Sequence, residues 1–177
     1  MKKNILTISI CFFQLSFGAN RPYNDVLKEL APTECTQVKE NIYLSQKDRV
    51  AIEEMSSTKI YGGLALRYVT TCPNTKEKSY HYVDSHIVRT LNETVILTIH
   101  NDKLKSFIVS SFNEPREYIA PKKWYAQFEG AEGKKVLRAR EEIDALSGAT
   151  LTVNASIGSV NKTLALHRYL KSQKKVP

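Results

Sequence analysis

The stretch from residue 79 to residue 112 constrains the fold more than any other part of the chain. It contains two runs rich in β-branched and aromatic residues, 94–100 and 105–112, separated by the short Asn-Asp-Lys segment 101–103. Asn and Asp favour the tight turn of a β-hairpin. The runs are apolar enough for a sheet that helices cover on one face, and no Gly-x-Gly-x-x-Gly indicates a dinucleotide-binding fold. The pattern predicts an antiparallel sheet.

Helical patterns lie on both sides of this β region. Residues 20–57 are expected to be mostly helical, with Pro32 ending a first segment and a second one running from 45 to 55. Apolar residues recur at helical spacing from Ile157 to about Ser172, and their stripe is expected to belong to the core. The predicted fold class is therefore α+β: an antiparallel β-sheet packed by helices, with a helical N-terminal lead-in.

The first 18 residues have the layout of a secretory signal peptide. Lys2 and Lys3 precede an apolar run that ends at Phe17 and is too short to span a bilayer, and small residues follow at Gly18 and Ala19. We expect cleavage after Gly18 and a periplasmic or otherwise extracytoplasmic protein; an uncleaved N-terminal anchor is the alternative.

The remaining chain is expected to divide into a helical lead-in (19–58), one domain (59–172) and a basic tail (173–177). Loss of the signal peptide leaves 24 basic and 18 acidic residues, a net charge of +6. Because these charges are scattered, they indicate a solvated, mildly basic surface or an acidic redox partner. Export argues against nucleic acid as a partner.

Cys35 and Cys72 are the cysteines that remain after cleavage. Outside the cytoplasm such a pair favours one disulfide, which would stabilise the fold by about 3–4 kcal/mol on the chain-entropy model. Two separate thiols are the alternative. The chain has no Cys-x-x-Cys-His motif for covalent haem, and its His and Cys spacings indicate no zinc site.

A short segment before the last helical pattern has the residue types of an anion site. It contains Asp144, Ser147, Gly148, Ala149, Thr150, Leu151 and Thr152. Gly148 permits backbone conformations closed to other residues, and Thr150 presents a hydroxyl beside this bend. A helix capped by Thr152 or Asn154 would direct free N–H groups at an anion held there. An ordinary turn that caps a helix is the alternative.

The pattern Asp-x-x-Ser-Gly-Ala-Thr in this segment resembles the flavinylation motif of FMN-binding domains, including those of sodium-pumping quinone reductases. In that family a transferase moves FMN from FAD onto the final threonine as a phosphoester. The resemblance implies covalent FMN on Thr150, with Asp144 as the motif aspartate and 147–149 as the bend. Asp144 would bind metal and phosphate during attachment, or cap the bend.

Two further segments resemble the small, stand-alone exported members of that family. Residues 82–90 are similar to their Tyr-Val-Asp-x-His-x-Val-Arg-Thr stretch. Residues 114–128 are similar to their Glu-Pro-x-Glu-Tyr segment and the aromatic-rich helix after it. The resemblance covers residues 80–170 or so, whereas the lead-in before residue 60 has no match.

These segments provide candidates for contacts with an isoalloxazine ring, which needs flat walls and a few hydrogen bonds. Tyr118 and Trp124 are candidate walls, with core packing as the alternative. Arg89 could steady a phosphate or the reduced, anionic flavin. His86 could donate to the ring, although an exposed or otherwise satisfied histidine is the commoner outcome.

The sequence thus predicts an exported flavoprotein that carries FMN covalently and transfers electrons outside the cytoplasm. The resemblance implies one partner, an FAD-dependent flavin transferase that uses a magnesium ion. A redox donor and a redox acceptor would be further partners; the sequence does not identify them, and either could be membrane-bound. A carrier fits better than an independent catalyst, because no nucleophile–base pair or metal cluster is recognisable. The alternatives are a flavin-dependent reductase of a small extracytoplasmic acceptor and a non-redox binding module with an unmodified motif.

Overall fold

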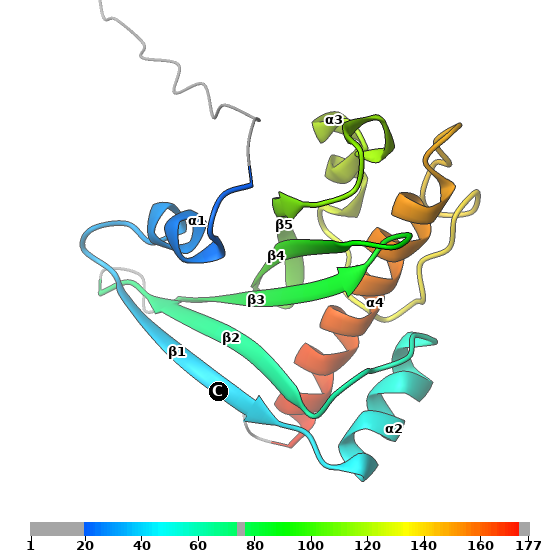
Figure 1. Cartoon of the computed structure of the whole chain (residues 1–177). Coiled ribbons are helices and arrows are strands. Elements are labelled where there is room, and N and C mark those ends of the chain that lie inside the picture. Colours follow the sequence, from blue (N-terminus) through cyan, green and yellow to red (C-terminus); the bar gives the residue numbers. More distant parts are fainter. Residues whose placement is uncertain (1–19, 74–76, 174–177) are drawn as a thin grey trace, which may run out of the picture.

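A single antiparallel sheet forms the centre of the molecule (Figure 1). The computed structural model describes residues 20–73 and 77–173, so the predicted signal peptide and nearly all of the predicted basic tail lie outside the described residues. Five strands follow one another in the sheet in chain order. They are β1 (Thr36–Tyr43), β2 (Leu64–Thr71), β3 (Lys78–Ile87), β4 (Asn92–His100) and β5 (Lys103–Phe112).

The predicted hairpin is confirmed in β4 and β5. Asn101 and Asp102 form its turn with φ values of 51° and 61°, a left-handed conformation that Asn and Asp tolerate better than most residues. His100 pairs with Lys103 directly across the turn. The short polar turn therefore begins the pairing of β4 with β5, whose register shifts between Thr98 and Ile99 and again between Thr94 and Val95.

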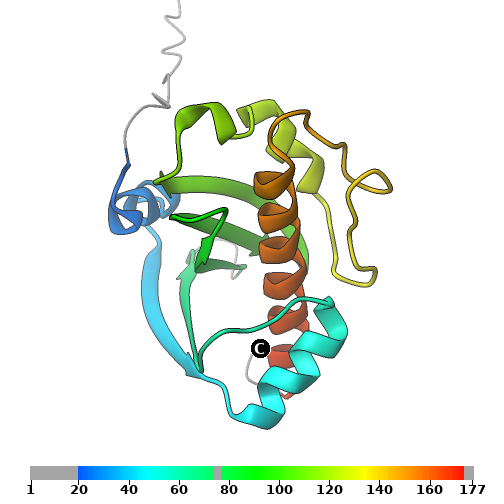
Figure 2. The same ribbon diagram turned by 45° about the vertical axis from the view of Figure 1, so that its right-hand side comes forward.

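The predicted α+β class is confirmed, but helices cover both faces of the sheet and not one face as the apolar runs suggested (Figure 2). The long α4 (Thr150–Ser172) crosses one face with α2 (Gln46–Ser56) beside it. The main core lies between α4 and this face and includes Leu97, Val160 and Leu164. On the other face, α1 (Tyr23–Leu30) packs Val26 and Leu27 against Ile96. None of the helices in the described part of the chain is long and apolar enough to span a bilayer.

The lead-in contains a strand that the sequence analysis misses. Helices α1 and α2 are present, but β1 lies between them and pairs with β2 along its whole length. The prediction of a mostly helical segment was wrong here because β1 lacks the apolar alternation of a half-buried strand. Its half-buried positions include Gln37, which donates to Thr70 Oγ1 (3.1 Å), and Glu40, which pairs with the buried Arg67.

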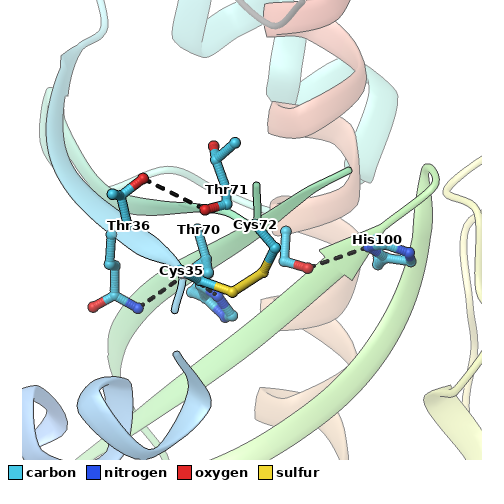
Figure 3. The surroundings of a disulfide bond; sticks show 9 residues. Cys35, Thr36, Thr70, Thr71, Cys72 and His100 are labelled. Carbon is cyan, nitrogen blue, oxygen red and sulfur yellow. Dashed lines mark hydrogen bonds between the residues drawn. A yellow bond between two sulfur atoms is a disulfide. The ribbon is translucent and has the colours of Figure 1, made fainter. Parts of the chain in front are cut away.

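The lead-in is also joined covalently to the sheet. Cys35 and Cys72 form a disulfide at the end of the β1–β2 pair, next to the pairing of Thr36 with Thr71 (Figure 3). This is the pairing that the sequence analysis favours. It closes a loop with a sequence separation of 37 that contains β1, α2 and β2.

Short helical turns follow β5, and a long connection, residues 129–149, leads from them to α4. These turns are η1 (Arg116–Tyr118), α3 (Lys122–Tyr125) and η2 (Ala126–Phe128). The connection is held to the rest of the fold by hydrogen bonds. Asn161 of α4 accepts from the Leu137 N–H and donates to its carbonyl, both at 2.9 Å. These bonds place the segment that precedes α4.

Candidate functional site

The segment that resembles a flavinylation motif turns directly into α4. Gly148 has φ +80°, a left-handed conformation that favours glycine, and Ala149 is the N-cap residue. Thr150 is therefore the first residue of the helix, and the predicted cap at Thr152 or Asn154 was wrong. The hydroxyl of Thr152 is buried and donates instead to the carbonyl of Tyr118 at 2.6 Å.

The start of α4 is open to an anion. The first intrahelical bond runs from Val153 N–H to the Ala149 carbonyl (3.0 Å). The N–H groups of residues 150–152 therefore precede the hydrogen-bonded ladder. Among the described residues, no side chain caps this end and no acidic residue lies in its first turn. A helix of 23 residues thus presents its positive end beside the exposed Thr150.

A small pocket of about 230 Å³ lies at this helix start. It is formed by three segments that are far apart in the sequence: the turn after β3, the segment after β5, and the motif itself. The lining residues are Val88, Arg89, Glu114, Tyr118, Gly148, Ala149, Thr150, Leu151 and Thr152. The structure therefore brings the candidates Arg89 and Tyr118 together with most of the motif.

Arg89 is the cation of this pocket. Its guanidinium donates to the Tyr118 hydroxyl at 3.1 Å and lies 5.5 Å from the centre of the Tyr118 ring. These contacts orient a side chain that is otherwise exposed. Guanidinium groups and free helix N-termini both commonly bind phosphate in proteins, and this pocket has one of each.

Glu114 positions the turn that carries Arg89, a role that the sequence analysis did not assign. Its carboxylate accepts hydrogen bonds from the backbone N–H groups of Arg89 (3.1 Å), Thr90 (2.5 Å) and Leu91 (2.7 Å). The bonds from Thr90 and Leu91 lower the pKa of Glu114. The one sequence signal is a Glu-Pro pair, which indicates a local turn, whereas the turn that Glu114 holds lies more than twenty residues earlier in the chain.

Trp124 contacts the backbone of the motif and is not among the residues that line the pocket. Its side chain is buried, and the indole N–H donates to the Asp144 carbonyl at 2.7 Å. The Asp144 N–H in turn donates to Gln127 Oε1 at 2.8 Å. These two bonds fix the backbone at the start of the motif, while the side chains of Asp144 and Ser147 are exposed.

His86 lies in a separate, charged cluster in the sheet. One ring nitrogen contacts Asp84 Oδ2 at 3.1 Å and the other contacts Glu93 Oε2 at 3.0 Å. Asp84 also accepts from Lys162 (2.6 Å) and Ser159 (2.7 Å) of α4. With both nitrogens engaged, His86 acts as a cation that joins β3 and β4, and it does not line the pocket.

This cluster predicts a loss of stability at alkaline pH. Burial lowers the pKa of His86, but hydrogen bonds with Asp84 and Glu93 outweigh burial and raise the pKa from 6.5 to about 9. Since the folded pKa exceeds the unfolded one, the stabilisation is complete below pH 6.5 and is lost as the pH rises through about 9. The difference corresponds to about 3 kcal/mol.

Urea unfolding at pH 6.5 and pH 9 measures this effect, with His86→Gln as the control. The variant is expected to be less stable at pH 6.5 and to change little between the two pH values. Burial lowers the pKa of His81 and His167, so these two residues change the free energy of unfolding only below about pH 6.5. The change expected between pH 6.5 and pH 9 is therefore assigned to His86. A wild type with equal stability at both pH values contradicts the charged cluster.

Part of the chain matches a known protein family. Residues 91–165 match the family model described as the FMN-binding domain. This range begins in the turn that Glu114 holds, includes β4, β5 and the whole motif, and ends within α4. No curated protein and no solved structure matches the chain.

Proposed function

The chain contains a domain of the FMN-binding family, which its residues 91–165 match, and from this premise we propose that it carries one FMN covalently on Thr150 and transfers electrons outside the cytoplasm. The observation that carries the proposal is the exposed Thr150 hydroxyl at the uncapped start of α4, in the pocket that Arg89 lines. FMN binding follows from the family; the covalent bond, the export and the electron transfer are the proposal.

The residues of the pocket suit the phosphate end of FMN. The three N–H groups at the start of α4 and the guanidinium of Arg89 offer hydrogen bonds and positive charge to a phosphodiester. The space beside Gly148 is open, since a Cβ added there would meet no atom within 4 Å. A phosphoester on Thr150 would therefore have its charge compensated on the protein itself.

Attachment would be carried out by a transferase, as in the family that the motif resembles. The Thr150 Oγ would attack the flavin-side phosphorus of FAD, forming the Oγ–P bond. The bridging P–O bond of FAD would break, AMP would leave, and the hydroxyl proton would pass to the transferase. The exposed Asp144 carboxylate is then available to the magnesium ion that this enzyme brings.

The size of the pocket favours a carrier. Its volume of about 230 Å³ is below the range of roughly 300–1,000 Å³ usual for sites that enclose a small molecule. It would hold the phosphate and leave part of the flavin accessible to a partner. Bound FMN supplies one- and two-electron chemistry, and an accessible ring can exchange electrons with a protein partner.

Two further features support a function outside the cytoplasm. The predicted signal peptide at residues 1–18 directs the chain to export. The Cys35–Cys72 disulfide suits an oxidising compartment. A covalent link also prevents loss of a cofactor that an exported protein cannot readily replace.

The proposal is tested by intact mass of the mature chain after co-expression with a flavin transferase and without it. We expect a gain of one FMN less one water that survives denaturation and occurs only with the transferase. The transferase must first modify a known acceptor domain. No gain would favour an unmodified binding module, whereas turnover of a small acceptor by the purified flavoprotein would favour a reductase.

A further inference from the structure

A second, larger cavity lies along β5, the edge strand of the sheet. We call it the β5 groove; its volume is about 1690 Å³. Residues Ser106 to Asn113 form its floor without a gap in the sequence. One wall comes from α1 and the segment before it, and the other comes from η1, α3 and η2. The two walls lie on opposite sides of β5 (Figure 1).

The outer edge of β5 is paired at both ends and open between them. At one end, the Arg21 N–H donates to the Ser110 carbonyl (2.9 Å), and Asn20 Oδ1 accepts from the Phe112 N–H (2.9 Å). At the other end, Leu104 exchanges two backbone hydrogen bonds of 2.8 Å with residues 130 and 131. Among the described residues, no backbone group bonds to the outer edge of 105–109.

The groove has an apolar wall on each side of this open edge. Phe107 packs with Tyr125 on the α3 side, with ring centres 4.7 Å apart. Ile108 packs on the other side with the cluster that contains Val26. Phe107, Ile108 and Val109 are each only half-buried. A strand added here would place alternate side chains against the two walls.

The dimensions and charges of the groove decide between possible occupants. Its volume exceeds the range of roughly 300–1,000 Å³ usual for small molecules and suits a chain segment. On the α1 side, Arg21 pairs with Glu29. The residues that line the α3 side include the cations Arg116, Lys122 and Lys123 and the acid Glu129. Glu114 also lines the groove, but its carboxylate accepts hydrogen bonds from the backbone N–H groups of residues 89–91. The groove therefore favours an extended segment with acidic residues on its α3 side.

We propose that the β5 groove binds an extended segment of a partner protein by β-strand addition, with apolar side chains at alternate positions and acidic residues near α3. In this mode backbone hydrogen bonds to the edge supply affinity and the two walls select side chains. Glu114 lines both the groove and the pocket at Thr150. The partner would thus lie beside the proposed flavin, although binding itself does not require the flavin.

The test uses the unmodified mature chain, so that its outcome is independent of flavin attachment. The probe is a nine-residue peptide of alternating valine and threonine with aspartate at both ends. NMR titration is expected to shift the amide signals of residues 106–109 and to slow their hydrogen exchange. Lys123→Glu is expected to weaken binding about tenfold, whereas Lys39→Glu, an equal charge change on β1, leaves it unchanged.

Two N-methylated peptides distinguish strand addition from contact with an apolar surface. An added strand uses the N–H groups of alternate residues only. Methylation of one alternate set should weaken binding about tenfold or more, and methylation of the other set should have little effect. Equal effects of the two sets, or unchanged 106–109 signals at millimolar peptide, would overturn the proposal. Concentration-dependent shifts of the same signals without peptide would overturn it in favour of a second copy of this chain.

Discussion

Thr150→Ala is expected to abolish flavin attachment completely while the protein remains folded. The substitution removes the only atom of residue 150 that can form the phosphoester. Because Thr150 is exposed at the first position of α4, alanine there costs little stability. The measurement is the intact mass of the denatured protein after co-expression with the transferase. Unchanged urea unfolding would show that the loss is chemical and not a failure to fold.

Two matched variants identify the acceptor atom. Thr150→Ser keeps a hydroxyl at the helix start and is expected to retain the added mass. Ser147→Ala removes the other exposed hydroxyl of the motif and is also expected to retain it. An added mass that survives Thr150→Ala but disappears in Ser147→Ala would move the acceptor to Ser147 and contradict the proposed role of Thr150.

The sequence predicts those parts of the candidate site that are formed by residues close together in the chain. The motif contains its own turn residue, Gly148, and the apolar spacing after it marks α4. Arg89 and Tyr118 were candidates through a resemblance, and the fold brings them to the same pocket as Thr150. The position of the helix start was not predictable, because it depends on Tyr118 accepting the hydrogen bond of Thr152.

The remaining positions depend on pairings between distant segments. His86 is directly opposite Glu93 in the β3–β4 register and shares a strand face with Asp84. His86 therefore lies between two carboxylates. The spacing of residues along one strand does not reveal this cluster, because Glu93 comes from the neighbouring strand. Glu114 bonds to residues 89–91 for the same reason: the partner is near in space and distant in sequence. Strand β1 is specified by polar contacts to β2, such as Glu40 with Arg67, so no apolar period marks it.

Removal of the Cys35–Cys72 disulfide is expected to have the largest effect on folding stability. A cross-link that closes a loop with a separation of 37 residues restricts the unfolded chain and stabilises the fold by about 4 kcal/mol on the chain-entropy model. This is a large share of the roughly 5–15 kcal/mol typical of a domain. The double variant Cys35→Ser/Cys72→Ser should lose about that amount of unfolding free energy in urea.

A reductant provides the control for this prediction. It should lower the stability of the wild type to that of the double variant and leave the double variant unchanged. Equal stability of the oxidised and reduced wild type would contradict the predicted contribution. Flavin attachment should persist in the folded double variant, because the disulfide joins β1 to β2 whereas the pocket is formed by the turn after β3, the segment after β5 and α4. The disulfide would then serve stability in an oxidising compartment, and the chemistry at Thr150 would be independent of it.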